Sequence, residues 1–186
     1  MINISDNKKA ILDAAESIFA KKGAKASTLA DIARKANISK GTLYYYYTTK
    51  KELITDVADR HLNKISDSLK SFTSSLKSKT DVRKSLRTLF EKVKMQPDFS
   101  SIQICIMSEA ATNKSIMNKI KEKNSEWLFE IEHTLETFYK DNAEICKGIA
   151  AMILALIYSS TVLNAGNIED ISHNMEKLIR IGGSNI

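Results

Sequence analysis

Residues 28–53 constrain the fold more than any other segment, because two helix starts occur there only a few residues apart. Thr28 and Asp31 have the spacing of a capping box, in which a hydroxyl accepts from a free backbone N–H and an acid lies near the positive helix end. Ile32 and Ala33 then begin an apolar face at helical spacing. Since Ala33 is small, this short helix is expected to be crossed closely by a second one.

A turn and a second short helix follow directly. Asn37 belongs to the few residue types that tolerate a left-handed turn conformation. Ser39 is a typical N-cap, and the helix that it starts is expected to run roughly from Lys40 to Tyr46 with Leu43 pointing inward. Two short helices joined by a tight turn predict a helix-turn-helix.

The outer side of the second helix carries residues that suit the major groove of DNA. Lys40 can reach a phosphate or a guanine edge, and Thr42 and the tyrosines can contact phosphates and thymine methyl groups. The alternative is that the tyrosines belong to the core and the lysines are ordinary surface residues. Four consecutive residues of one helix cannot all face a core, so at least two of the tyrosines at 44–47 must be exposed. Exposed aromatic residues beside basic ones favour DNA binding.

A third helix is predicted to start immediately afterwards. Thr49 and Glu52 form a second capping box, and Lys50 lies in the first turn, where backbone N–H groups also attract phosphate. Apolar residues then recur at three- and four-residue steps from Leu53 to Leu76. One long helix is therefore expected to lead from the helix-turn-helix into the rest of the chain, so that tilting its far end would move the near end.

The segment from about Ile11 to Leu53 reads A-x-x-x-F-x-x-x-G and then T-x-x-x-I-A-x-x-A-x-(I/V)-S-K-G-T-L-Y-x-Y-(F/Y)-x-x-K-x-x-L. In these positions it resembles the TetR/AcrR family of bacterial transcriptional regulators. Asn37 stands where that family usually has Gly, and Tyr47 where it usually has Phe. The predicted DNA-binding residues are Thr28, Ser39, Lys40, Gly41, Thr42, Tyr44, Tyr45, Tyr46 and Lys50.

Charge is distributed as a DNA-binding N-terminal segment requires. The chain of 186 residues has a formal net charge of +6, from 28 basic and 22 acidic residues. Ten of the basic and five of the acidic residues lie in residues 1–53, which gives that segment a net charge of +5 and the remainder +1. The excess therefore coincides with the predicted helix-turn-helix. Its spread over three short helices argues against a basic amphipathic membrane helix.

Composition predicts an all-α fold, because the chain has one proline, 43% hydrophobic residues and no strand-like alternation. The resemblance implies a three-helix helix-turn-helix DNA-binding domain in residues 1–50 and a helical regulatory domain, for ligand binding and dimerisation, in residues 51–186. Outside residues 28–76, helices are expected at roughly 6–22, 81–95, 99–111, 113–140, 143–164 and 169–180.

The helix expected at 143–164 is apolar nearly all round from Ile149 to Val162, so it must be covered on more than one side. This pattern fits a homodimer interface, and the resemblance implies a four-helix bundle made of two long helices from each chain. The alternative is that these helices are the core of a monomer. We prefer the dimer, because a two-fold pair places two recognition helices about 34–36 Å apart on successive major grooves. The predicted interface residues are Ile131, Leu135, Ile149, Met152, Ile153 and Leu156.

The resemblance also implies a small-molecule effector in the C-terminal domain, whose binding separates the two DNA-reading ends. Polar or soft residues on otherwise apolar faces are candidates, although methionine and aromatic residues at helical spacing are more often ordinary core. The chain lacks an acidic, aromatic-rich cluster, which disfavours a polycationic ligand and leaves an apolar or mixed small molecule. The candidate pocket residues are Met107, Glu109, Met117, Trp127 and Tyr158.

Other residue types give little sign of further chemistry. Cys105 and Cys146 lack partner spacing, which predicts a reduced cytoplasmic protein, with redox sensing as the alternative. The three histidines lie far apart, so neither a metal site nor another cofactor is predicted. No signal peptide is expected, and the apolar run Ile149–Leu163 falls short of the roughly 20 residues that a membrane span needs. Ser39–Thr42 lacks the glycine run and strand of a phosphate-binding loop, and no catalytic arrangement stands out, so an enzyme is not expected.

These observations predict a dimeric transcriptional regulator that binds double-stranded DNA. The resemblance implies a repressor that a small-molecule effector releases from a palindromic operator. The alternative is an architectural or nucleoid-associated DNA-binding protein without an effector.

Overall fold

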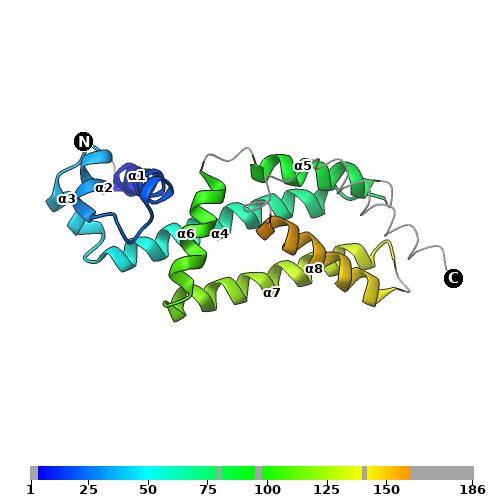
Figure 1. The fold of residues 1–186 in the computed structure, drawn as a ribbon. Coiled ribbons are helices and arrows are strands. Elements are labelled where there is room, and N and C mark those ends of the chain that lie inside the picture. The colour runs from blue at the N-terminus through cyan, green and yellow to red at the C-terminus, as the bar shows by residue number, and fades with distance from the viewer. Residues whose placement is uncertain (1–3, 79–80, 95–97, 140–141, 160–186) are drawn as a thin grey trace. The chain divides into compact units, whose positions relative to one another are not determined.

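The structure is a computed structural model that describes residues 4–78, 81–94, 98–139 and 142–159. Every regular element within these ranges is a helix, which confirms the predicted all-α class (Figure 1). The helices are α1 (Ile4–Lys22), α2 (Leu29–Lys35), α3 (Lys40–Tyr46), α4 (Lys50–Ser75), α5 (Val82–Lys94), α6 (Phe99–Ala110), α7 (Lys114–Glu136) and α8 (Ala143–Ser159). The helix predicted at 169–180 lies outside the described residues. None of the described helices has the length and apolarity needed to cross a bilayer.

The described residues form two compact units that are interleaved in the sequence. The first contains those of Met1–Leu62 and Asp98–Lys119, and the second contains those of Asn63–Pro97 and Ile120–Ile186. The first unit therefore holds α1, α2, α3, α6 and the beginnings of α4 and α7. The functional boundary predicted at residue 50 falls inside this unit and stays a prediction.

In the first unit, α1 packs on α2 and on α6, and α2 packs on α3 (Figure 1). One buried side chain from each of the first three helices shows where their shared core lies: Phe19, Ile32 and Leu43. The helix α1 ends as its sequence predicts, because Gly23 has a φ of 76° and its N–H donates to the carbonyl oxygen of Phe19 at 2.8 Å. Glycine reaches this left-handed conformation without a steric cost.

The helix α4 has 26 residues and begins with the predicted second capping box. The N–H of Glu52 donates to the hydroxyl of Thr49 at 3.2 Å, and the N–H of Thr49 donates to the Glu52 carboxylate at 3.4 Å. From Leu53 to Leu76 the predicted apolar residues are buried, which confirms one long amphipathic helix.

In the second unit, the end of α4 packs with α5, α7 and α8 around large buried side chains such as Leu86, Trp127 and Ile153. Polar contacts join the helices beside this core. The indole N–H of Trp127 donates to the hydroxyl of Ser66 at 2.8 Å, which links α7 to α4. The hydroxyl of Tyr158 donates to the side-chain oxygen of Asn124 at 2.6 Å, which links α8 to α7.

Candidate nucleic-acid interface

The start of α2 is fixed by the capping box that its sequence predicts. The hydroxyl of Thr28 accepts from the N–H of Asp31 at 3.1 Å, and the N–H of Thr28 donates to the Asp31 carboxylate at 3.2 Å. Lys22, at the end of α1, donates to the same carboxylate at 2.8 Å. Hydrogen bonds from Lys22 and then Thr28 lower the pKa of Asp31 from 3.8 to about 2. An ionised Asp31 therefore ties the end of α1 to the start of α2.

The turn between α2 and α3 has the predicted conformation. Asn37 has a φ of 54°, in the left-handed region that asparagine tolerates better than most residues. Ile38 returns the chain toward α2, because its N–H donates to the carbonyl oxygen of Ala33 at 3.1 Å. Ser39 then caps α3: its hydroxyl accepts from the N–H of Thr42 at 2.9 Å and lies 2.8 Å from the Thr42 hydroxyl. Local hydrogen bonds thus determine how α3 is presented.

The helix α3 has one buried face and one exposed face. Leu43 is fully buried, whereas Tyr44 and Tyr45 are 53% and 78% exposed. Tyr46 is half-buried, and its ring meets the ring of Tyr45 edge-on with 5.3 Å between their centroids. Two tyrosines are thus exposed, as the sequence argument requires. Large aromatic side chains are usually more favourable when buried, and exposed ones that lie together can mark an interaction site. This face of α3 is therefore a candidate contact surface.

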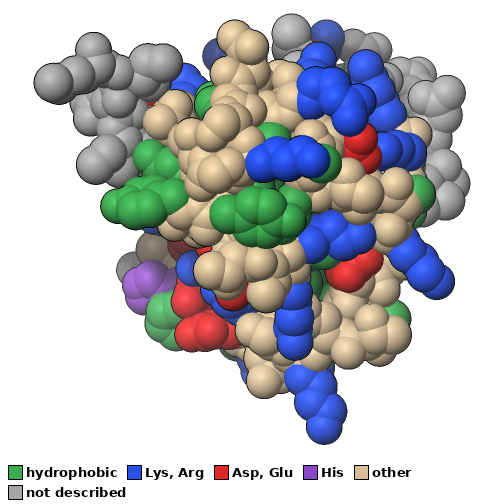
Figure 2. Space-filling view, turned by 90° about the vertical axis from the view of Figure 1, so that its left-hand side faces the viewer, with side chains coloured by type: hydrophobic (Ala, Val, Ile, Leu, Met, Phe, Trp, Pro, Cys, Tyr) green, Lys and Arg blue, Asp and Glu red, His purple; other side chains and the backbone are tan. Residues whose placement is uncertain are grey.

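Most of the other predicted DNA-binding residues are also accessible in this region. Lys40 and Gly41 are exposed on the first turn of α3, and Thr28 and Ser39 are exposed N-cap residues. Figure 2, which views this end of the molecule, shows exposed hydrophobic side chains with several Lys and Arg side chains beside them and fewer Asp and Glu side chains. A positively charged surface with aromatic side chains matches the phosphate and base-edge chemistry of DNA.

Tyr47, the residue that follows α3, has a different role from the other tyrosines. It is buried, and its hydroxyl donates to the carboxylate of Asp56 in α4 at 2.9 Å. Lys8 of α1 lies 2.8 Å from the same carboxylate. Burial raises the pKa of Asp56, but hydrogen bonds from Lys8 and Tyr47 outweigh it, so the pKa is lowered overall. Tyr47 therefore anchors the end of α3, and nothing in its sequence spacing identifies Asp56 and Lys8 as its partners.

Lys50 makes contacts that its sequence position does not reveal. Its ammonium group donates to the carbonyl oxygens of Ala24, Lys25 and Ser27 at 2.9, 3.2 and 2.9 Å, an arrangement that we call the Lys50 anchor. An ammonium group has three N–H donors, and here each has an acceptor. A phosphate contact would compete with these bonds. The DNA contact of Lys50 stays a prediction, whereas its structural contacts to the connector between α1 and α2 are observed.

The five predicted pocket residues are divided between the two units. Met107, Glu109 and Met117 belong to the first unit, and Trp127 and Tyr158 belong to the second. Trp127 is buried, and the polar atoms of Trp127 and Tyr158 hydrogen-bond to Ser66 and Asn124, as described above. Only Glu109 of the five lines a groove of about 350 Å³ between the end of α1 and α6. Their joint role in an effector site stays a prediction.

The predicted dimer residues also differ in exposure. Four of them are buried within their own chain: Ile131, Leu135, Ile149 and Ile153. Leu156 is half-buried, and Met152 is 41% exposed on α8. Small residues extend the accessible face of α8 on either side of Met152, namely Gly148, Ala151 and Ala155. The exposed part of α8, rather than the buried isoleucines, is thus available to another chain.

The two cysteines are free thiols, and burial raises the pKa of Cys105 and of Cys146. A raised pKa lowers the fraction of reactive thiolate, which disfavours redox sensing. Among the residues that the structure describes, no group of His, Cys, Asp or Glu side chains is arranged to hold a metal ion.

Comparison with known proteins connects this geometry to one family. Residues 11–57 match the family described as bacterial regulatory proteins, tetR family. The chain is 26% identical to the HTH-type transcriptional regulator YuxN of Bacillus subtilis over 180 residues, which is 92% of this chain and 62% of YuxN. It therefore spans less than two thirds of the length of that relative.

Two further likenesses concern the N-terminal segment and the fold. The chain is 37% identical over 62 residues to IcaR of Staphylococcus epidermidis, the negative transcriptional regulator of the biofilm operon icaADBC, and the match covers 33% of this chain and 34% of IcaR. The crystal structure of a TetR-family regulator from Mesorhizobium loti superimposes with a TM-score of 0.74 over 96% of this chain and 95% of that one, at 16% identity.

Proposed function

We propose that the chain is a transcriptional regulator of the TetR/AcrR family and that it binds double-stranded DNA through the exposed face of α3. This family consists of regulators and not of enzymes. The observation that supports the proposal most directly is the pair of exposed tyrosines, Tyr44 and Tyr45, beside Lys40 on a helix that is held by local caps. Such a helix can enter a major groove while its buried side keeps its orientation. In a bacterium this function belongs to the cytoplasm, where the chromosome lies.

We further propose that two copies of the chain act together as a homodimer. One α3 helix of seven residues can read only a few base pairs, and a two-fold pair would read a palindromic site. The accessible face of α8 that contains Met152 and Ala155 supports this step, because small residues allow helices to approach closely. In this arrangement the buried isoleucines of α7 and α8 support the interface from behind.

Repression is the proposed direction of regulation. The similarity of the N-terminal segment to that of IcaR, a negative transcriptional regulator, supports repression. We also propose a small-molecule effector that releases the protein from its operator. This part of the proposal rests on the resemblance to the family and on the candidate pocket residues.

The DNA-binding proposal is tested by selecting bound fragments from bacterial genomic DNA and mapping the protected bases. A regulator of this kind protects one or a few palindromic sites, whereas an architectural protein protects many unrelated sites. Replacing Tyr45 or Lys40 by alanine should then relax the preference for particular bases, and each lost base contact should cost about 1–3 kcal/mol of discrimination.

The control for that experiment is Lys121→Ala, which removes an exposed lysine from α7 outside the helix-turn-helix unit. It should leave base preference unchanged. If base preference is the same in the Tyr45, Lys40 and Lys121 variants, α3 does not read the sequence and the proposal is wrong.

A further inference from the structure

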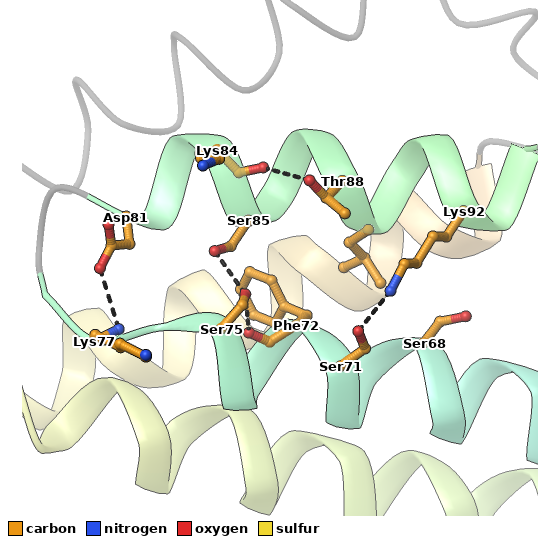
Figure 3. Close-up of a pocket in the computed structure, with 11 residues that line it drawn as sticks. Ser68, Ser71, Phe72, Ser75, Lys77, Asp81, Lys84, Ser85, Thr88 and Lys92 are labelled. Carbon is orange, nitrogen blue, oxygen red and sulfur yellow. Dashed lines mark hydrogen bonds between the residues drawn. The ribbon is translucent and has the colours of Figure 1, made fainter.

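A groove of about 330 Å³ lies between the last turns of α4 and the helix α5, entirely within the second unit (Figure 3). Phe72 and Leu89 are buried side chains that provide its apolar lining, and Ser68 and Ser85 are buried beside them. This volume is within the range of sites for small molecules. The groove shares no residue with the predicted effector pocket or with the proposed DNA-binding face.

Hydroxyl groups line both walls of the groove. On α4 they belong to Ser68, Ser71 and Ser75, and on α5 to Ser85 and Thr88. Their spacing of three to four residues places each set on one helix face, next to the buried apolar face. The sequence thus places hydroxyl groups at a contact between α4 and α5 where apolar side chains would otherwise pack.

The hydrogen bonds of these hydroxyls determine what they offer to a ligand. Ser68 donates to the carbonyl oxygen of Lys64 at 2.9 Å, and Thr88 donates to that of Lys84 at 3.0 Å. Each of these oxygens still has a lone pair that can accept a hydrogen bond. These walls can therefore accept hydrogen bonds from the hydroxyl groups of a polar molecule.

The rim of the groove is positively charged. Lys77, Lys84 and Lys92 provide three ammonium groups against one carboxylate, that of Asp81, among the lining residues. That carboxylate is already engaged, since it accepts from the backbone N–H of Lys77 at 3.2 Å and from the hydroxyl of Ser78 at 2.9 Å. The lining has a surplus of positive charge, which favours an anion.

One of these lysines is already positioned across the groove. The ammonium group of Lys92, on α5, donates to the hydroxyl oxygen of Ser71, on α4, at 2.6 Å (Figure 3). A hydroxyl that accepts in this way keeps its own O–H as a donor, and an ammonium group keeps two further N–H donors. Charged and neutral donors therefore converge at this end of the groove, as in sites that bind phosphate or carboxylate groups.

We propose that this groove binds a small organic anion, namely a hydroxylated metabolite that carries a phosphate or carboxylate group. The anionic group contacts the ammonium group of Lys92 and the O–H of Ser71, while Lys84, about two turns before Lys92 on α5, adds positive charge to the rim. The hydroxyl groups of the ligand donate to the oxygens of Ser68 and Thr88, and its carbon skeleton lies against Phe72 and Leu89. The site is independent of DNA binding, so its existence does not rest on the proposed function.

The test measures thermal unfolding and calorimetric binding of the full chain at constant ionic strength. The probes are inorganic phosphate, glycerol 3-phosphate, glycerate and glycerol. We expect a saturable rise of the unfolding midpoint with glycerol 3-phosphate or glycerate and none with glycerol. The stronger of the two organic anions identifies the phosphate or the carboxylate as the preferred group. If neither binds, or if glycerol binds equally well, the proposal is overturned.

Three variants separate the groove from general attraction of anions to lysines. The double variant Lys84→Gln/Lys92→Gln should raise the Kd of the preferred anion about tenfold or more, because it removes the charge-assisted hydrogen bond from Lys92 and the rim charge of Lys84. Ser71→Phe leaves every charge in place but fills the groove from an exposed position, and it should also abolish binding. The matched control Lys70→Gln removes an exposed lysine of α4 outside the groove and should change the Kd less than about twofold.

Circular dichroism confirms that each variant is folded, so that loss of binding is not loss of structure. Binding that survives Ser71→Phe, or that Lys70→Gln weakens as much as the double variant, would show that anions are attracted to surface charge alone. Either result overturns the proposed site, and neither bears on whether the protein binds DNA.

Discussion

At the residue scale, the connector between α1 and α2 depends on a side chain that comes much later in the sequence. The Lys50 anchor gives three backbone carbonyl groups a charged donor, and Lys50 itself is only half-exposed. Hydrogen bonds of this kind to a charged group contribute more to stability than those between neutral groups. The position of the connector relative to the start of α4 therefore depends on Lys50.

Replacing Lys50 by alanine should lower the free energy of unfolding by about 1–3 kcal/mol, because the carbonyl groups of the connector lose a charged donor. Urea unfolding of the full chain, followed by circular dichroism, measures the change. Lys51→Ala is the matched control, since Lys51 is the exposed neighbour. If the two variants unfold alike and only Lys50→Ala binds DNA less tightly, Lys50 acts as a phosphate ligand instead.

The residues whose roles could be predicted from sequence are those whose partners are three to five positions away. Thr28, Asn37 and Ser39 determine the local backbone by short-range hydrogen bonds, so their spacing alone reveals them. Lys50 and Tyr47 could not be assigned in this way. Their partners are separated from them by longer stretches of sequence, and only the packing of helices brings them together.

At the element scale, the short helices of the helix-turn-helix rely on their caps, because seven residues form an isolated helix poorly. The carboxylate of Asp31 belongs to both the α2 cap and the ion pair with Lys22. Its protonation should therefore loosen the end of α1 and the start of α2 together.

Stability should consequently depend on pH through Asp31. Hydrogen bonds from Lys22 and then Thr28 lower the pKa of this group from 3.8 to about 2 in the folded state. A lowered pKa stabilises the folded protein above the unfolded value, and this contribution is lost as the pH falls through the folded value. Between pH 3.8 and about 2, the thermal midpoint of the natural protein should fall more steeply than that of Asp31→Asn.

The thermal midpoints of the natural protein and of Asp31→Asn should converge at the acid end of that pH range. Asp67→Asn serves as the control at an exposed position of α4. If Asp31→Asn follows the natural protein at every pH, the carboxylate does not stabilise the α2 cap.

The first turn of α3 allows stability and DNA binding to be separated at Gly41. A Cβ atom added there would meet only the hydroxyl oxygen of Ser39, at 3.7 Å, which is an ordinary contact. Gly41→Ala should therefore keep or raise the unfolding midpoint, since alanine favours a helix by about 0.5–1 kcal/mol over glycine. Binding to the selected DNA should weaken at the same time if the backbone of α3 lies against a phosphate, as the proposed interface requires.

Electrophoretic mobility shifts measure the affinity of Gly41→Ala for the selected DNA. Unchanged affinity would place the α3 backbone away from the DNA. Lys35→Ala, on α2, provides a comparison. It removes a positive charge and leaves the distance between the α3 backbone and the DNA unchanged.

At the scale of the whole molecule, apolar patterning predicts the helices of the second unit but does not distinguish core residues from interface residues. Ile131 and Ile153 were expected at an interface, and the structure buries both within their own chain. Core and interface residues are equally apolar in sequence, and only the fold shows which of them remain accessible. The groove between α4 and α5 was not predicted either, because serine and lysine residues are common on exposed helix faces.

Dimerisation is best tested on the accessible face of α8. Ala155→Glu places a charge there without disturbing the chain's own core, because Ala155 is exposed. We expect a shift from dimer to monomer in sedimentation velocity, since an unpaired charge is costly to bury, and with it the loss of operator binding. Ser125→Glu, at an exposed position of α7, should stay dimeric. A dimeric Ala155→Glu protein would rule out this face.

The Lys50 anchor has a consequence for how this protein can be altered. Its acceptors are main-chain oxygens, which every amino acid possesses, so the residues at 24, 25 and 27 can be exchanged without removing an acceptor. Only the donor, the ammonium group of Lys50, requires a particular side chain. The exposed side chain at position 25 can therefore be varied freely as long as the length of the connector and Lys50 are kept, whereas Ala24 and Ser27 are buried and their replacements must also fit the core.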